Sequence, residues 1–169
     1  MDIFIMSESD IEEVKQIEKD CQVGWWSLQD YKDEIGRKDG LAFVVKKESQ
    51  VIGFILARLI TQRDTIIQSA LETNSGSKTM ILETEIEIFN IAVKPNFQNQ
   101  GIGQKLINQI ISYTVNLQSR VIWLEVRKSN AKAIKFYKKN KFIKTFERKK
   151  FYSNPVEDGI IMKKSLTNF

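Results

Sequence analysis

The stretch Gln98-Asn99-Gln100-Gly101-Ile102-Gly103 decides the fold, because it stands directly between a predicted strand and a predicted helix. Glycines at such a turn let the backbone approach a ligand closely. The free amides of the first helical turn, helped by the helix dipole, then point at an anion, and a pyrophosphate is the natural guest. A plain strand-to-helix turn is the competing interpretation, since short Gly-x-Gly patterns are common.

Two common nucleotide-binding loops do not fit this stretch. The pattern Gly-x-x-x-x-Gly-Lys-Ser/Thr of the P-loop NTPases is absent from the sequence. The third glycine of the dinucleotide fingerprint is also missing, because bulky residues such as Ile107 follow.

On either side of the loop, the hydrophobic pattern predicts one alternating α/β or α+β unit. Strand character runs from about Met80 to Val93, and a helical stripe follows the loop as far as Val115. Capping signals at Ser9–Glu12 and Ser27 begin two earlier helices. The remaining predicted helix is 130–139, and the remaining strands are 41–46, 51–60, 121–126, 142–152 and 160–164. Helices on both faces of one sheet are expected, in a single domain over 1–169.

Composition narrows the chemistry. The chain has no histidine, which removes the usual Ser-His-Asp and Cys-His machinery and most catalytic zinc sites, so we expect no metal. The single cysteine, Cys21, fits packing better than nucleophilic catalysis. No apolar run approaches the roughly 20 residues that cross a bilayer, and the first residues do not resemble a secretory signal, so a cytoplasmic location is expected. The net charge of +5 fits an anionic cofactor, nucleic acid or a solvated lysine-rich surface.

With its neighbours, the loop resembles the Gln/Arg-x-x-Gly-x-Gly/Ala signature of the Gcn5-related N-acetyltransferases (GNAT). The similarity is greater to one branch, the RimI-type ribosomal-protein alanine N-acetyltransferases, and it is best from about Ile86 to Leu166. The matching motifs are Phe89-Asn90-Ile91-Ala92-Val93-Lys94-Pro95, Trp123-Leu124-Glu125-Val126-Arg127, Ser129-Asn130-Ala131, Ala133-Ile134, Phe136-Tyr137, Arg148-Lys149-Lys150-Phe151-Tyr152 and Asp158-Gly159-Ile160-Ile161-Met162.

The resemblance implies a sheet of about seven mixed strands that splay apart, with acetyl-CoA in the splay. It places the pantetheine arm on the backbone of Ile91, Ala92 and Val93, and a further cofactor contact at Asn130. It places the pyrophosphate on the amides of Asn99, Gln100, Gly101, Ile102, Gly103 and Gln104. The sequence departs from the family in three places: Asn99 stands where a basic residue is common, Asn140-Lys141 replaces a pair such as Leu-Gly, and 64–82 is longer than usual. Asn140 is expected to supply the left-handed helix end.

Two residues are candidates for the proton transfers of acetyl transfer. Glu125 is a lone acid in an apolar strand, where burial would raise its pKa and suit it as the base; a structural carboxylate paired with Arg127 or a lysine is the alternative. Tyr137 shares a helix stripe with Asn130, and the resemblance places it by the cofactor sulfur as a proton donor, although spacing alone favours a core aromatic. Trp25, Trp26 and Tyr152 are expected either to line the acceptor site or to pack. The row Glu83, Glu85 and Glu87 either attracts a cationic peptide or is solvated.

The resemblance implies direct acetyl transfer in a ternary complex to the N-terminal alanine of small-subunit ribosomal protein eighteen. The expected partner is therefore a protein N-terminus, with neither DNA nor a membrane, and the expected state is a monomer or weak dimer. Two alternatives remain open: acetylation of another amine (another N-terminus, a lysine or a polyamine), and a non-catalytic acyl-CoA-binding module on the ribosome. The basic stretch 132–150 is compatible with the latter.

Overall fold

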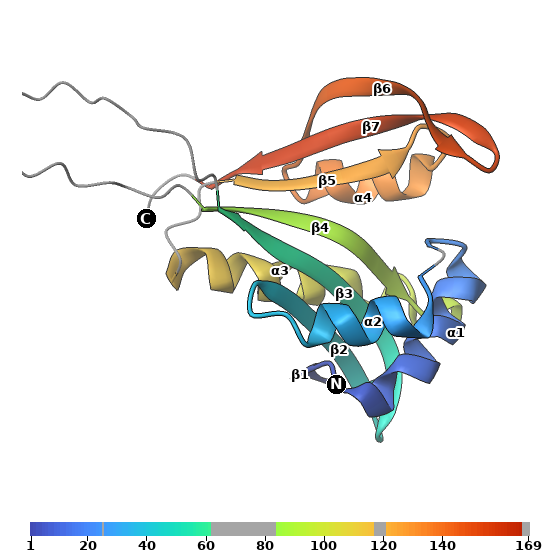
Figure 1. The fold of residues 1–169 in the computed structure, drawn as a ribbon, viewed down its shortest axis with the longest axis vertical. Coiled ribbons are helices and arrows are strands. Elements are labelled where there is room, and N and C mark those ends of the chain that lie inside the picture. The colour runs from blue at the N-terminus through green and yellow to red at the C-terminus, as the bar shows by residue number, and fades with distance from the viewer. Residues whose placement is uncertain (25, 62–83, 117–120, 167–169) are drawn as a thin grey trace, which may run out of the picture.

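The computed structural model describes residues 1–24, 26–61, 84–116 and 121–166, and within them a single seven-stranded sheet has helices on both faces (Figure 1). The strand order is β1-β2-β3-β4-β5-β7-β6. The strands are β1 (Asp2–Ile5), β2 (Gly40–Lys47), β3 (Gln50–Thr61), β4 (Thr84–Val93), β5 (Val121–Arg127), β6 (Ile143–Ser153) and β7 (Val156–Ser165). The helices are α1 (Ile11–Cys21), α2 (Leu28–Ile35), α3 (Ile102–Asn116) and α4 (Ala131–Lys139), with short 3-10 turns at Glu8–Asp10 and Pro95–Phe97.

The sheet opens at its centre, between β4 and β5. These two strands are parallel, and their pairing runs from Glu85 with Val121 to Ile88 with Leu124. Beyond that point β4 diverges from β5 (Figure 1), while β3 stays paired with β4 as far as Val93. The second half of β4 therefore keeps a partner on one side and faces the splay on the other.

A β-bulge lies where the splay begins. Leu56 of β3 pairs with Asn90 and Ala57 with Ile88, so Phe89 is an extra residue on β4. A bulge bends its strand and reverses which face the following side chains occupy. Ile88 accordingly packs in the core beneath α3, whereas Ala92 packs in the core beneath α1 and α2.

Two apolar cores flank the sheet. The first lies under α3 and α4 and contains the buried helix stripe Leu106, Ile107 and Ile110 that the sequence predicts. The second lies under α1 and α2 and includes Val14 and Ile17. The seven-stranded, mixed, splayed sheet expected from the resemblance is confirmed. Among the described residues, no helix is both long and apolar enough to cross a membrane.

Several local expectations were wrong. The strand Asp2–Ile5 was not predicted, and the first capping box joins Ser7 to Asp10, whose carboxylate accepts the Ser7 N–H at 2.9 Å, instead of spanning Ser9–Glu12. The left-handed residue after α4 is Lys141 (φ 68°), whereas Asn140 is buried and donates its side-chain amide to the carbonyl of Phe136. The expected strand start at Met80 and the long segment 64–82 lie outside the described residues.

Candidate active site

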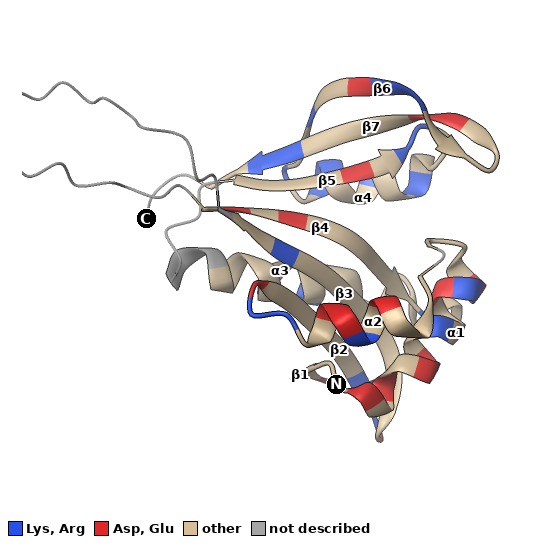
Figure 2. Ribbon diagram, in the orientation of Figure 1, with Lys and Arg blue, Asp and Glu red and all other residues tan. Residues whose placement is uncertain are grey.

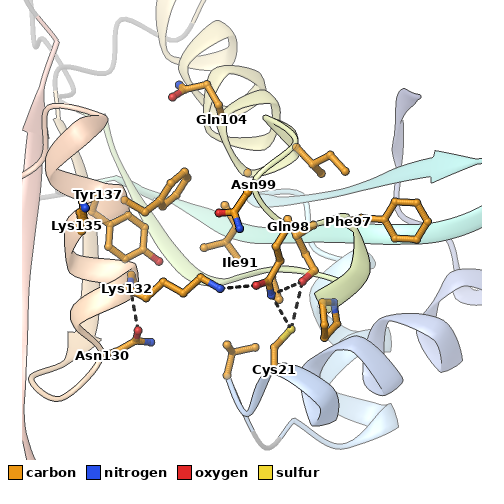
Figure 3. A pocket seen from close by; sticks show the side chains of 18 of the residues that line it. Cys21, Ile91, Phe97, Gln98, Asn99, Gln104, Asn130, Lys132, Lys135 and Tyr137 are labelled. Atoms are coloured by element: carbon orange, nitrogen blue, oxygen red, sulfur yellow. Dashed lines mark hydrogen bonds between the residues drawn. The ribbon is translucent and has the colours of Figure 1, made fainter.

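A cavity of about 910 Å³ occupies the splay, between the open half of β4, the start of α3 and one face of α4 (Figure 3). It collects most of the predicted cofactor-binding residues, although they are dispersed over forty positions of sequence. Those that line it are Ile91, Ala92, Val93, Asn99, Gly101, Ile102, Gly103, Gln104 and Asn130. Gln100 is not part of the lining, and its side-chain amide donates to the carbonyl of Asn96 at 3.1 Å.

The glycine loop has the backbone shape that a close ligand approach requires. Asn99 (φ 62°) and Gly101 (φ 82°) both adopt left-handed conformations, and a side chain at Gly101 would meet open space within 4 Å. α3 then starts at Ile102 with no acidic side chain in its first turn. Because the first amides of a helix have no intrahelical acceptor, this end of α3 is suited to an anion.

The open half of β4 turns main-chain polar groups toward the cavity. The carbonyl of Val93 accepts from the side-chain amide of Gln98 at 2.8 Å and from the thiol of Cys21 at 3.3 Å. The carbonyl of Ala92 faces the other way, against Gly53 of β3. By the alternation of a strand, Ile91 also directs its N–H and C=O to the side of Val93. An extended ligand could add to this edge as a strand would.

Tyr137 reaches the cavity from α4, with its hydroxyl directed into it (Figure 3). Tyr137 is 7% exposed, and its ring packs against Phe136 and Phe142. Burial raises the pKa of Tyr137 well above its usual value, so the hydroxyl is protonated at neutral pH. Asn130 caps the same helix by accepting the Ala133 N–H at 3.0 Å. Tyr137 can therefore act as a proton or hydrogen-bond donor.

Glu125 lies on β5 outside the cavity lining, beside Arg148 of β6. One carboxylate oxygen is 3.3 Å from the Arg148 guanidinium, and the other is buried without a hydrogen-bond partner. Gly159 of β7 leaves room for it, since a Cβ there would come within 2.8 Å of the buried oxygen. Burial raises the pKa of Glu125, and the charge of Arg148 and the hydroxyl of Tyr152 oppose that rise without cancelling it.

The sequence predicts Arg127 or a lysine as the partner of Glu125 if that carboxylate is structural, but the partner found is Arg148. Arg127 pairs with Glu157 at 3.3 Å and its guanidinium stacks over the ring of Tyr152, 4.1 Å from the centroid. Alternate residues of β5 are half-buried, so the strand is covered fully on one face and partly on the other. Glu125 belongs to the partly covered face.

Two of the residues proposed for the acceptor site, Trp26 and Glu87, are linked through Phe89 and Arg58. Trp26 packs near Phe89, with ring centroids 6.2 Å apart, and Phe89 lies under the Arg58 guanidinium. Arg58 is the cross-strand partner of Glu87, whose charge also raises the pKa of Glu125. Glu85 accepts from the Trp123 indole at 3.0 Å and is thus not simply solvated. Trp25 and Glu83 lie outside the described residues.

The cavity lining also includes residues that sequence reasoning did not assign to the site, among them Cys21, Gln98 and Lys132. Gln98 begins the glycine loop and could have been chosen from the motif, whereas Cys21 and Lys132 carry no local signal. Within the described residues, no group of three or more His, Cys, Asp or Glu side chains is arranged to hold a metal ion.

This combination of a splayed mixed sheet, a glycine loop and a cavity between them defines an acyltransferase class. The chain belongs to the acetyltransferase (GNAT) family, whose model matches residues 11–142, more than half of the sequence. The family uses acetyl-CoA.

Among curated relatives, the chain is similar to the [ribosomal protein bS18]-alanine N-acetyltransferase of Escherichia coli strain K12, with 38% identity over 86 residues. That match covers 50% of this chain and 58% of the relative, so the chain spans little more than half of that protein. The enzyme of the same name from Haemophilus influenzae is 28% identical over 156 residues, covering 90% of both chains.

Solved structures give the same fold. The crystal structure of the ribosomal-protein-S18-alanine N-acetyltransferase from Escherichia coli has a TM-score of 0.76 at 25% identity, covering 99% of this chain and 95% of that one. The Arabidopsis thaliana NAA60 structure in complex with acetyl-CoA has a TM-score of 0.79 at 19% identity, covering 98% of both chains. At that lower identity the second likeness concerns the fold alone.

Proposed function

We propose that this protein transfers the acetyl group of acetyl-CoA to the α-amino group of a protein N-terminus, specifically the N-terminal alanine of ribosomal protein S18 in the cytoplasm. The observation that carries the proposal is the placement of Glu125 and Tyr137. Tyr137 directs a protonated hydroxyl into the cavity, and Glu125 holds a carboxylate of raised pKa on the half-covered face of β5. The relatives named for bS18 alanine acetylation support the choice of acceptor.

In the reaction the amine loses a proton, and the departing thiolate must be protonated or stabilised by a hydrogen bond. The neutral amine attacks the thioester carbonyl carbon, so a C–N bond forms and the C–S bond breaks. Glu125, directly or through a water, takes the proton that the amine loses. The departing thiolate receives a proton or a hydrogen bond from Tyr137.

The transfer is proposed to occur directly, within a ternary complex of enzyme, acetyl-CoA and peptide. A covalent acetyl-enzyme would need an activated nucleophile, and the chain contains no histidine to activate one. Burial raises the pKa of the Cys21 thiol, which disfavours the reactive thiolate. An N-terminal amine, with a pKa near 8 against about 10.4 for lysine, needs the least activation by a carboxylate.

The test is incubation of the purified protein with acetyl-CoA and a panel of amines, read by mass spectrometry. The panel contains an alanine-initiated peptide, the same peptide with a blocked N-terminus and one internal lysine, and a polyamine. Preferential acetylation of the free alanine terminus supports the proposal. Preference for the lysine peptide or the polyamine would assign the protein to another acceptor class. Binding of acetyl-CoA without acetylation of any acceptor would favour a non-catalytic module.

A further inference from the structure

Opposite the glycine loop, the cavity is lined by a positively charged face of α4. Its lining includes three lysines, Lys132, Lys135 and Lys139, which recur at three- and four-residue spacing on α4. Among the described residues that line it, Asp20 is the one carboxylate. Figure 2 shows the concentration of basic residues on α4. The cavity is therefore electropositive on the side that faces the amides of the loop.

The two walls are held close together by direct packing. Gly103, in the first turn of α3, lies against the ring of Phe136 on α4, and a Cβ at position 103 would come within 3.1 Å of that ring. The start of α3 and the lysine face of α4 consequently border the same narrow space. An anion seated on the amides of α3 has α4 as its neighbour.

Lys132 crosses this space. Its ammonium donates to the side-chain oxygen of Gln98, the first residue of the glycine loop (Figure 3). Gln98 in turn donates to the carbonyl of Val93, on the open edge of β4. The Lys132 side chain thus reaches from α4 to the place where the loop and the open strand meet. A neutral amide is its acceptor there, although an ammonium gains more from an anion.

We infer that Lys132 is a cofactor-binding residue that exchanges Gln98 for the pyrophosphate of acetyl-CoA. This inference rests on the proposed function. The glycine loop from Gln98 to Gly103 has no charged side chain of its own, and Lys132 supplies a positive charge from the opposite wall. Lys135 and Lys139 add to the positive field, and within the described residues none of the three lysines forms an ion pair with a carboxylate. By contrast, Lys144 and Lys149 of β6 are both paired with Glu147.

The exchange also has a consequence for β4. When Lys132 turns to a phosphate, the Gln98 side chain is no longer held between Lys132 and Val93. The Val93 carbonyl can then accept from an amide of the pantetheine arm. Binding of the two parts of the cofactor is coupled through Gln98.

The experiment compares Lys132→Met with Lys138→Met by isothermal titration calorimetry. Lys138 is an exposed lysine on α4 that does not line the cavity, so its replacement removes the same charge from the same helix. Three ligands are titrated: acetyl-CoA, acetyl-dephospho-CoA, which lacks the 3′-phosphate, and acetyl-pantetheine, which lacks all phosphates. Lys132→Met is expected to weaken the binding of the first two by about fivefold to tenfold and not to weaken the binding of the third, which has no phosphate for Lys132 to contact. Lys138→Met should bind all three as the wild type does.

The other possible outcomes of the titrations contradict either the inference about Lys132 or the proposed function. Equal affinity of Lys132→Met and wild type for acetyl-CoA would overturn the inference. A loss for acetyl-CoA but not for acetyl-dephospho-CoA would move the contact to the 3′-phosphate and overturn the pyrophosphate assignment. A wild type that binds none of the ligands would overturn the proposed function itself, which distinguishes the two failures. Lys132→Arg, which keeps the charge, is expected to retain most of the affinity.

Discussion

The carboxylate of Glu125 touches the guanidinium of Arg148 with one oxygen, at 3.3 Å, and buries the other without a partner. The Arg148 charge and the burial of the carboxylate shift the pKa of Glu125 in opposite directions. The cation favours the ionised form of the carboxylate, whereas burial penalises it, and burial is the larger effect on the pKa. The result is a carboxylate that is more basic than an exposed glutamate, which suits it to accept a proton.

Glu125→Gln keeps the size of the side chain but removes its ability to accept a proton. Turnover of an alanine-initiated peptide is expected to fall by about 10²- to 10⁴-fold at neutral pH. The defect should shrink as the pH rises, because more of the amine arrives already neutral. Rates of both proteins from pH 6 to 9 measure this. A defect that is constant over that range would make Glu125 structural.

Arg148→Met should move the acid limb of the pH–rate profile to higher pH. The Arg148 charge lowers the pKa of Glu125, so its removal lets that pKa rise further. Glu125 must be deprotonated to act as the base, and a higher pKa leaves less base at a given low pH. Profiles of kcat/KM against pH provide the check. Arg148→Lys restores the charge and should return the limb toward the wild-type position; coincident profiles of all three proteins would exclude Glu125 as the titrating group.

Tyr137→Phe removes the hydroxyl while keeping the ring that packs against Phe136 and Phe142. We expect turnover to fall because the thiolate loses its donor, and we expect the Kd for acetyl-CoA to change little. Calorimetry and steady-state rates on the same preparation separate the two effects. Unchanged turnover would remove Tyr137 from the mechanism and leave it as a core aromatic.

Gly101→Val tests the glycine loop. The position has a left-handed φ of 82°, which strains any residue with a Cβ, and the added side chain would project into the open space where a phosphate is proposed. Acetyl-CoA at a hundredfold excess over its Kd should stabilise the wild type by about 2.7 kcal/mol. The rise in Tm that this stabilisation causes on addition of acetyl-CoA should be absent in the variant. Gly36→Ala, at a right-handed position remote from the cavity lining, is the control that should retain it.

The elements that the sequence predicts well are those whose pattern is local. The stripe Leu106, Ile107 and Ile110 has helical spacing, and the glycine loop before it has its own backbone chemistry. β1 lacks such a signal, because Phe4 and Ile5 remain largely exposed and the strand pairs with β2 alone. The left-handed Lys141 was unpredictable for a similar reason, since nothing in a lysine favours that conformation.

The same distinction, between local patterns and tertiary packing, decides which parts of the site could be predicted from the sequence. Asn130 and Tyr137 could be placed together because one helix carries both. The Arg148 partner of Glu125 depends on the order β5-β7-β6, which brings residues 23 positions apart to the same face. The span of Lys132 to Gln98 depends on how closely α4 packs against α3. Contacts set by tertiary packing leave no trace in the spacing of residues, and the catalytic roles of Glu125 and Tyr137 stay predictions until the variants are measured.

The open edge of β4 has a consequence for the protein's behaviour in a crowded solution. An unpaired strand edge on the outside of a sheet invites self-association with other chains. Here the carbonyl of Val93 lies within the splay, where it accepts from Gln98 and from Cys21 of α1, and the Lys132 side chain reaches across to the same Gln98. The narrow pantetheine arm of the cofactor can enter the splay and hydrogen-bond to the edge of β4. A strand of another chain, with its side chains, would collide with α1 and α4. The open edge of β4 can therefore hydrogen-bond to the cosubstrate, while the surrounding helices keep it from pairing with strands of other chains.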